Sequence, residues 1–238
     1  INVRGATDVD IIDNTITLNG IGISVGDNDA LANDTYSSNV NVFGNEITRS
    51  SGNGIFVGDS SENVVIGSTN TGEGNRIGTN VRNRRGLGNR HNGVHINAAG
   101  PGVEISGNSI VGNGARRTSN GRSGIRLQEQ LESVTISENN ISSNREHGIQ
   151  VDAAVVGTAV AADIQKNMLF RNYGSGIHLT NTTFALNIGS STPSTANPTD
   201  VGNDFISNRR FGIDASSGDA TIGGNKMLGN RRGGIDGT

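Results

Sequence analysis

The sequence repeats one short pattern eight times from end to end, and internal repetition restricts the fold of a chain more than any other feature. The pattern is Asn-x-Φ-x-x-Asn, where Φ is an apolar residue, followed later by Gly-Φ-x-Φ. The first asparagines of the eight copies are Asn14, Asn45, Asn75, Asn108, Asn139, Asn167, Asn203 and Asn225. The shortest step between them is 22 residues. That length suits one bare coil of a solenoid, and the longer steps then hold insertions.

Each repeat contains three short segments in which apolar residues alternate with polar ones. The segment before the first asparagine reads Φ-x-Φ, as in Val103-Glu104-Ile105, and the last reads Gly-Φ-x-Φ, as in Gly93-Val94-His95-Ile96. Because the apolar spacing is two and turn residues separate the segments, an amphipathic helix is excluded and strands are predicted. Stacked coils lie about 4.8 Å apart, so each apolar position forms an internal column.

We therefore predict an all-β fold, a single-stranded right-handed parallel β-helix of about eight coils with three short strands per coil. One domain spans residues 1–238. The second asparagine positions are Asn19, Ser50, Asn80, Asn113, Asn144, Asn172, Asn208 and Asn230. We expect both asparagine positions to lie at corners with left-handed backbone, each amide bonding to the next one in its column. The glycine before the third strand is expected at a corner too.

Composition narrows the partners and the surroundings of this chain. The formal net charge is −3 and the pI is near 5.8, which argues against a bulk nucleic-acid binder. The absence of cysteine excludes a disulfide scaffold and thiolate metal sites, and no apolar run is long enough to span a bilayer. The sequence begins without Met and ends directly after the eighth third strand. We therefore expect a segment of a longer chain, or a unit whose open ends contact flanking domains or other copies.

The repeat also sorts outward-facing residues into columns, because the x residue of Gly-Φ-x-Φ points away from the core. The first column reads Ser24, Phe56, His95, Arg126, Gln150, His178, Asp214 and Asp236. Two places further along the strand, a second column reads Gly26, Gly58, Asn97, Gln128, Asp152, Thr180 and Ser216. The equivalent column on the Φ-x-Φ strand carries neither His nor Arg. A solvated strand accepts any polar residue, so the first column is either a binding face or ordinary surface.

The turn that enters the third strand is repeatedly basic. Its arginines are Arg84, Arg85, Arg90, Arg116, Arg117, Arg122, Arg145, Arg171, Arg209, Arg210, Arg231 and Arg232. Stacked coils turn these residues into a cationic stripe on a chain of negative net charge. The planar guanidinium fork suits carboxylates and sulfates, and a repeating polyanion along the axis would meet one such group per coil. A solubilising turn composition is the alternative interpretation.

The repeat resembles the parallel β-helix repeat of mannuronan C5-epimerases, periplasmic copper-loading proteins and many bacterial surface proteins, within the pectate-lyase-like superfamily. The resemblance covers essentially the whole chain and implies the fold, while its relatives range from lyases, epimerases and hydrolases to passive stalks. The epimerase motif Tyr-Gly-Phe-Asp-Pro-His has its nearest match in Phe211-Gly212-Ile213-Asp214-Ala215-Ser216. Asp214 matches the Asp of the motif, whereas Phe, Ala and Ser replace its Tyr, Pro and His. Glu146-His147-Gly148 resembles the Gly-His-Gly of polygalacturonases.

These patterns predict an extracellular or cell-surface module that binds an acidic polysaccharide, with cleavage or epimerisation of that polymer as an extension. The catalytic candidates are His95, Arg126, Asp152, His178 and Asp214. The substrate-binding candidates are Phe56, Arg90, Arg122, Arg145, Gln150, Arg171, Tyr173, Arg209 and Arg210. The arginines would neutralise carboxylates and a histidine or tyrosine would exchange protons. Asp152 and Asp214, roughly 10 Å apart by strand spacing, would suit inverting hydrolysis.

A non-catalytic structural or adhesive segment of a bacterial surface protein is the alternative function. No cofactor is expected. A weak calcium hypothesis attaches to Asp27, Asp29 and Asp34, which lack the order of ligands found in an EF-hand. A metal held by His95 and His178 is disfavoured, because two coils separate them. We expect neither nucleic acid nor a membrane as partner.

Overall fold

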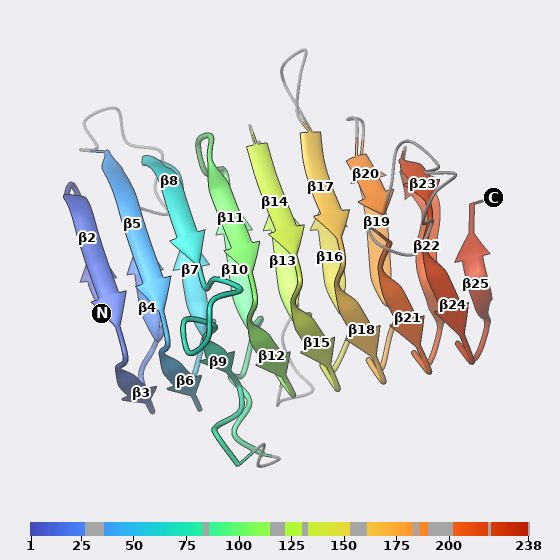
Figure 1. The fold of residues 1–238 in the computed structure, drawn as a ribbon, viewed down its shortest axis with the longest axis horizontal. Helices are drawn as coiled ribbons and strands as arrows, with labels where there is room; N and C mark the ends of the chain where they lie inside the picture. The colour runs from blue at the N-terminus through green and yellow to red at the C-terminus, as the bar shows by residue number, and fades with distance from the viewer. Residues whose placement is uncertain are drawn as a thin grey trace.

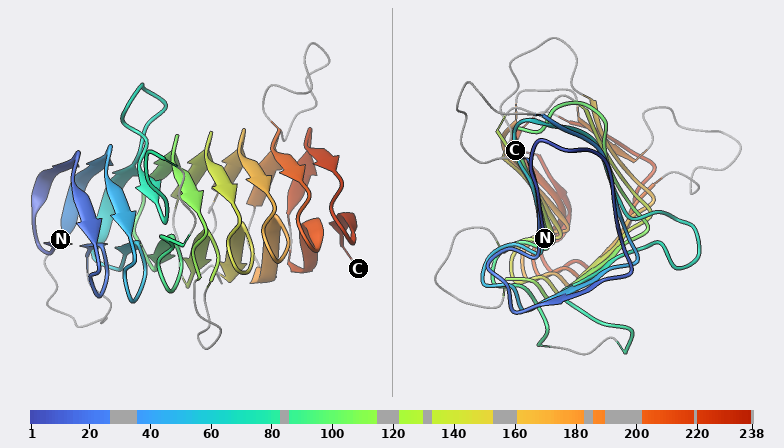
Figure 2. Two further views of the ribbon diagram at one scale, coloured as in Figure 1. Left: turned by 90° about the horizontal axis from the view of Figure 1, so that it is seen from below. Right: turned by 90° about the vertical axis from the view of Figure 1, so that its left-hand side faces the viewer.

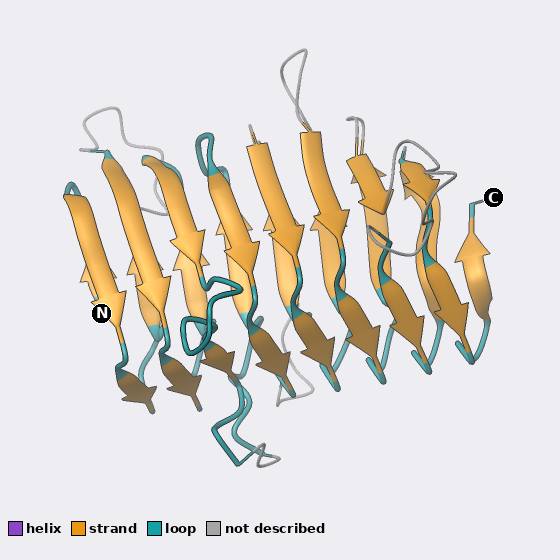
Figure 3. Ribbon diagram, in the orientation of Figure 1, coloured by secondary structure: helices purple, strands orange, loops and turns teal. Residues whose placement is uncertain are grey.

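The computed structural model describes residues 1–26, 36–82, 86–114, 122–129, 133–152, 161–182, 186–189, 202–218 and 220–237. Within these ranges every regular element is a strand and there is no helix (Figure 3). The strands follow one another around a common axis and stack into a rod (Figure 1). Viewed along that axis, the coils superimpose around a shared interior (Figure 2, right). The predicted parallel β-helix is therefore confirmed.

Three parallel sheets form the sides of the rod. Sheet A contains β1 (Asn2–Val3), β4 (Ile23–Val25), β7 (Ile55–Val57), β10 (Val94–Asn97), β13 (Ile125–Gln128), β16 (Ile149–Asp152), β19 (Ile177–Thr182), β22 (Phe211–Gly218) and β25 (Gly233–Asp236). Sheet B contains β2 (Thr7–Ile12), β5 (Ser37–Phe43), β8 (Ser61–Ile66), β11 (Val103–Ser106), β14 (Ser133–Ser137), β17 (Ala161–Gln165), β20 (Leu186–Gly189) and β23 (Thr221–Gly223). Sheet C contains β3 (Thr15–Thr17), β6 (Glu46–Thr48), β9 (Arg76–Ile77), β12 (Ser109–Val111), β15 (Asn140–Ser142), β18 (Met168–Phe170), β21 (Asp204–Ile206) and β24 (Lys226–Leu228).

Sheet A is built from the Gly-Φ-x-Φ segments, and its inward positions form buried aliphatic columns. The first of these columns reads Ile23, Ile55, Val94, Ile125, Ile149, Ile177 and Ile213, all with no exposed surface. β-branched side chains fit this pleated, fully buried environment. Sheet A holds one strand more than predicted, because Asn2 and Val3 pair with Ser24 and Val25 ahead of the first full coil.

The first asparagine of each repeat forms an unbroken ladder inside the corner between sheets B and C. In seven successive steps from Asn14 to Asn225, the backbone N–H and the side-chain Nδ2 of one asparagine both donate to Oδ1 of the next. The predicted ladder is thus present. The left-handed residue, however, is the one before the asparagine, such as Asp13, Glu138 or Lys166. The residue before the asparagine therefore adopts the left-handed backbone conformation, and the side chain of the asparagine points inward.

The second ladder corrects one position of the predicted pattern. Ser50 donates its backbone N–H to Oδ1 of Asn89, and Asn89 donates to Oδ1 of Asn113. Asn80 was expected there, but it lies in an insertion and its Oδ1 accepts the backbone N–H of Arg82. The spacing of Asn75 and Asn80 therefore matched the repeat by coincidence. From Asn113 the ladder continues through Asn144, Asn172, Asn208 and Asn230.

Close approach of the coils, not left-handed backbone, explains the glycine that precedes each sheet A strand. A Cβ on Gly148 would lie 2.6 Å from the carbonyl oxygen of Gly176 and 2.9 Å from Cδ2 of Leu169. A Cβ on any of the equivalent glycines would lie 2.5–2.7 Å from the carbonyl oxygen of the glycine in the next coil. These glycines are Gly22, Gly54, Gly93, Gly124, Gly176 and Gly212. No side chain fits in this column without moving backbone.

Gly148→Ala is therefore expected to lower the free energy of unfolding by about 2 kcal/mol, the usual cost of overpacking a tight interior. Urea unfolding followed by circular dichroism measures the change. Gly20→Ala is the matched control, because a Cβ on Gly20 would meet nothing within 4 Å, and the change there is expected to be neutral or slightly stabilising. Equal losses for the two variants would contradict the close-approach explanation.

Candidate functional site

The outward face of sheet A places the predicted first column in one line. The strand register pairs His95 with Phe56 and Arg126, and Gln150 with Arg126 and His178. Asp214 then pairs with His178 and Asp236. The second column is confirmed from Asn97 through Gln128 to Asp152. It fails at its end, because a register shift after His178 pairs Thr180 with Ser217 instead of Ser216.

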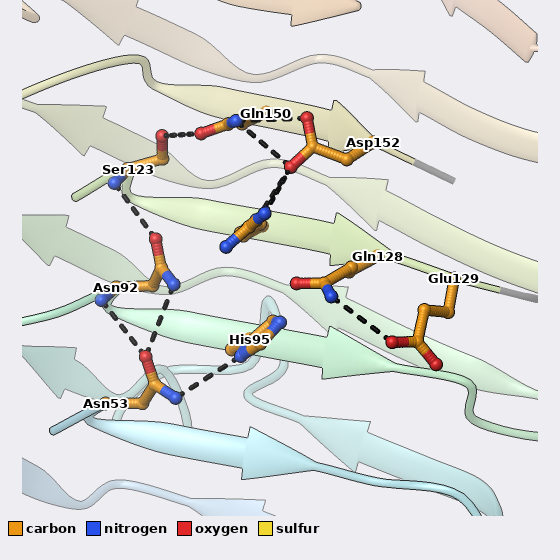
Figure 4. Close-up of polar contacts among 9 residues, drawn as sticks. Asn53, Asn92, His95, Ser123, Gln128, Glu129, Gln150 and Asp152 are labelled. Atoms are coloured by element: carbon orange, nitrogen blue, oxygen red, sulfur yellow. Dashed lines mark hydrogen bonds and ion pairs between the residues drawn. The ribbon is translucent and has the colours of Figure 1, made fainter. Parts of the chain in front are cut away.

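Arg126 and Asp152 form an ion pair within the chain. Nε and an Nη of Arg126 both lie 2.7 Å from Oδ2 of Asp152. Nε2 of Gln150 donates to both oxygens of the same carboxylate at 3.0 Å, and Oγ of Ser123 donates to Oε1 of Gln150 at 3.0 Å (Figure 4). The side chains of Arg126 and Asp152 are only 20% and 15% exposed. The charge of Arg126, predicted to neutralise a ligand carboxylate, is thus paired with Asp152 within the chain.

His95 is held as a neutral ring by its surroundings. Oδ1 of Asn53 accepts from the backbone N–H of Asn92, which directs Nδ2 of Asn53 to Nδ1 of His95 at 3.3 Å (Figure 4). Nδ1 is therefore the acceptor, and the ring proton sits on Nε2. Burial, with the charge of Arg126 second, lowers the pKa of His95 to about 4. The ring also meets Phe56 edge-on, with centroids 5.5 Å apart.

His178 lies between a carboxylate and a second histidine. Its Nδ1 is 3.1 Å from Oδ2 of Asp214, whose Oδ1 accepts the hydroxyl of Ser216 at 2.9 Å. The rings of His178 and His147 are stacked with centroids 4.3 Å apart. A histidine in contact with a carboxylate is an arrangement suited to proton exchange, although the contact lacks the angles of a hydrogen bond.

His147 belongs to a third ladder that the sequence patterns did not reveal. In the turn before sheet A, Oδ1 of Asn53 accepts the N–H of Asn92, and Oδ1 of Asn92 accepts the N–H of Ser123. His147 occupies this position on the coil after Ser123, and its Nδ1 accepts the N–H of Ser175 at 3.1 Å in the same way. Burial, followed by the charges of His178 and Arg210, lowers the pKa of His147 to about 3. The signals in the sequence were its position immediately before the column glycine and the resemblance of Glu146-His147-Gly148 to Gly-His-Gly.

The basic turn forms two parallel columns beside sheet A, which we call the arginine edge. In the first column, residues of successive coils donate their N–H to the backbone carbonyl of the ladder residue of the preceding coil: Arg90, Gly114, Arg145, Tyr173, Arg209 and Arg231. The second column contains His91, Arg122, Glu146, Gly174, Arg210 and Arg232, and backbone hydrogen bonds join its members from Arg122 to Arg232 from coil to coil. Every arginine of the edge is exposed except Arg122, which is half-buried. The residues named in the two columns thus include seven arginines and one carboxylate, that of Glu146.

Tyr173 lies between two arginines of this edge. The guanidinium carbon of Arg209 lies 3.8 Å from the centroid of the Tyr173 ring, and that of Arg145 lies 5.5 Å from it. Cation–π attraction at these distances keeps long side chains in place. The N–H groups of a guanidinium lie in its plane, so a guanidinium stacked on the ring directs them away from the ring.

The remaining predicted residues are placed as follows. Arg171 precedes the ladder residue Asn172 and has left-handed backbone, so it belongs to the turn but not to the arginine edge. Of the two carboxylates predicted for hydrolysis, Asp152 contacts Arg126 and Asp214 contacts His178. Arg84, Arg85, Arg116 and Arg117, and the calcium candidates Asp27, Asp29 and Asp34, lie outside the described residues.

The described part of the chain contains no group of three or more His, Asp or Glu residues positioned to hold a metal ion. It also contains no helix with the length and apolarity needed to cross a membrane.

Comparison with known proteins agrees with this geometry. No curated protein sequence matches the chain. The family described as the right-handed β-helix region matches residues 1–225, nearly the whole length of the three sheets. Members of this fold are structural or carbohydrate-related β-helix proteins in general. The chain belongs to the right-handed β-helix family.

Proposed function

We propose that the chain binds an acidic polysaccharide along the arginine edge. The observation that carries the proposal is the stack of Arg145, Tyr173 and Arg209 on three successive coils. Because stacking orders the guanidinium groups in advance, less conformational entropy is lost when a carboxylate or sulfate binds. Charge-assisted, forked hydrogen bonds are the strong contacts available to such groups.

The repeat spacing favours a linear polymer as the ligand. Equivalent residues of neighbouring coils are about 4.8 Å apart, and the first column continues from Tyr173 and Arg209 to Arg231 on the next coil. A polyuronate or sulfated chain along the axis presents acidic groups at repeated intervals to match. The proposal implies an extracellular or cell-surface location, where such polymers occur.

Proton exchange on the bound polymer is the extension of this proposal. His178 lies next to the arginine edge through its stacking partner His147, whose pKa responds to the charge of Arg210. If turnover accompanies binding, we expect His178 to accept the proton, since the carboxylate of Asp214 lies 3.1 Å from its Nδ1 and would stabilise the charged ring. A screen for new unsaturated chain ends on alginate and polygalacturonate separates turnover from binding alone.

The alternative is a structural or adhesive segment. The continuous asparagine ladders and the ion pair between Arg126 and Asp152 suit a rigid rod whose charges serve its own stability. In that case no acidic glycan binds, and a glycan array covering polyuronates and sulfated polymers shows no signal above that of neutral polymers.

The double variant Arg145→Gln, Arg209→Gln is expected to weaken binding to polygalacturonate or alginate by about 100-fold, since each charge-assisted contact is worth roughly 1.4 kcal/mol. Isothermal titration calorimetry at low salt measures the change. The matched control is Arg76→Gln, Lys226→Gln, which removes the same charge from the face of sheet C and is expected to cost less than about 3-fold. Similar losses in both variants would indicate unspecific attraction and would contradict the assigned edge.

A further inference from the structure

A cavity of about 370 Å³ opens at the N-terminal end of the sheet A face. Four successive coils line it with Arg4, Ile21, Ser24, Asn53, Phe56 and His95, among others. His91 also lines it and belongs to the second column of the arginine edge. The cavity, which we call the end pocket, is therefore continuous with the edge. Its volume falls in the range of small-ligand sites, about 300–1,000 Å³.

The end pocket has an apolar floor and one apolar wall. Phe56 is 5% exposed and closes the floor, where its ring meets His95 edge-on. Ile21 stands at the side with 40% of its surface exposed. Rings with an apolar face bind against surfaces of this kind.

The polar groups of the pocket are fixed and uncharged on its inner side. The ladder through Asn92 orients the amide of Asn53, and that amide sets the tautomer of His95 (Figure 4). With a pKa of about 4, His95 is neutral at physiological pH. Arg4, which also interacts within the chain, is the positively charged residue that lines the pocket. An apolar floor, neutral hydrogen-bonding groups and a basic residue match a ring that carries hydroxyls and one carboxylate.

We propose that the end pocket holds a single uronic acid ring of the glycan that follows the arginine edge. This inference rests on the proposed function. The ring packs its C–H face against Phe56 and Ile21, while its hydroxyls face Ser24 and Asn53. Such a seat for one ring fixes the register of the whole polymer relative to the coils. Short fragments that cannot span the edge then bind through the end pocket.

Histidine side-chain NMR tests the pocket directly, because the chain has four histidines and two of them, His91 and His95, line it. Titration with trigalacturonate or trimannuronate is expected to shift the signals of His91 and His95 and to leave those of His147 and His178 in place. Shifts confined to His147 and His178 would overturn the assignment of the site.

Ser24→Phe fills the pocket from an outward position beside Phe56 and is expected to weaken binding of the trisaccharide at least 10-fold. The matched control, Thr135→Phe, makes the same change at an outward position of sheet B and is expected to leave binding unaltered. Unchanged trisaccharide affinity in Ser24→Phe would refute the pocket. The proposed function would survive that refutation if the Arg145→Gln, Arg209→Gln variant still lost its binding to the polymer. Failure of both ligands to bind the unaltered chain would refute the proposed function itself, and the pocket with it.

Discussion

Replacing Asn139 by leucine is expected to lower the free energy of unfolding by about 4 kcal/mol. The side chain of Asn139 makes five hydrogen bonds while only 2% of the residue is exposed. Its Oδ1 accepts the N–H and the Nδ2 of Asn108, and its Nδ2 donates to Ile105, Ser137 and Asn167. Leucine has about the same size but leaves the N–H of Asn108 without this acceptor. A buried polar group left unpaired costs about 1–3 kcal/mol, and this substitution disturbs the pairing of several.

Urea unfolding measures this loss, with Asn14→Leu as the control. Asn14 occupies the same ladder but is exposed, and its Nδ2 donates to Ile12 and Asn45. Water replaces these partners when the amide is removed, so we expect a cost below about 1 kcal/mol. A small effect at both positions would mean that the ladder follows from the stacking of the coils and contributes little to their stability.

The repeat spacing predicts the fold and most of the register, because stacked coils repeat the same contacts. It fails where an insertion creates a false copy of the pattern. Asn80 satisfied the spacing after Asn75, yet Asn89 occupies the ladder. Only the neighbouring coils distinguish the two, since the ladder residue must face Ser50 and Asn113 at once. Spacing within one repeat carries no information about that requirement.

The columns of the candidate site were predictable, but the pairing of their side chains was not. Column membership follows from alternation along a strand, whereas the contact between Arg126 and Asp152 depends on rotamers that reach across columns and coils. The same is true of Tyr173 and Arg209, since the guanidinium carbon of Arg209 lies 3.8 Å from the centroid of the Tyr173 ring. His147 was hidden for another reason. Its Nδ1 replaces an asparagine oxygen in the ladder, a substitution that only the geometry of the turn reveals.

These pairings separate two kinds of charge on one side of the rod. On sheet A, the charges of Arg126, Asp152 and Asp214 have partners within the chain. On the neighbouring turn, every arginine of the arginine edge except Arg122 is exposed, and Glu146 is the one carboxylate among the residues named in the two columns. Long-range attraction of a polyanion therefore comes from the turn, while the sheet offers shape and the hydrogen bonds of neutral groups.

The buried histidines predict a loss of stability in acid that one substitution relieves. The pKa of His147 is about 3 in the folded chain and about 6.5 when unfolded. Between these values the unfolded chain binds a proton that the folded chain does not, so stability is complete above pH 6.5 and falls as the pH is lowered. At pH 4.5 the loss from His147 is about 3 kcal/mol. His95 adds a separate loss over a narrower window, because its pKa is about 4.

His147→Asn is expected to abolish the part of this loss that belongs to His147. Asparagine is the residue used at the same ladder position in Asn53 and Asn92, so its Oδ1 takes over the N–H of Ser175. At pH 7.5 the variant is expected to lose about 1 kcal/mol with the stacking on His178, and at pH 4.5 to exceed the unaltered chain by about 2 kcal/mol. Urea unfolding at both pH values gives the comparison, in which the shared carboxylates and His95 cancel.

His147→Phe separates titration from hydrogen bonding at this position. Phenylalanine keeps a ring beside His178 and cannot take up a proton, but it leaves the N–H of Ser175 without the acceptor it has in His147. We expect this variant to be less stable than His147→Asn by about 1–3 kcal/mol at every pH, with the same reduced sensitivity to acid. If either variant kept the full acid sensitivity of the unaltered chain, the proton would be bound elsewhere, and the burial of His147 would not be its cause.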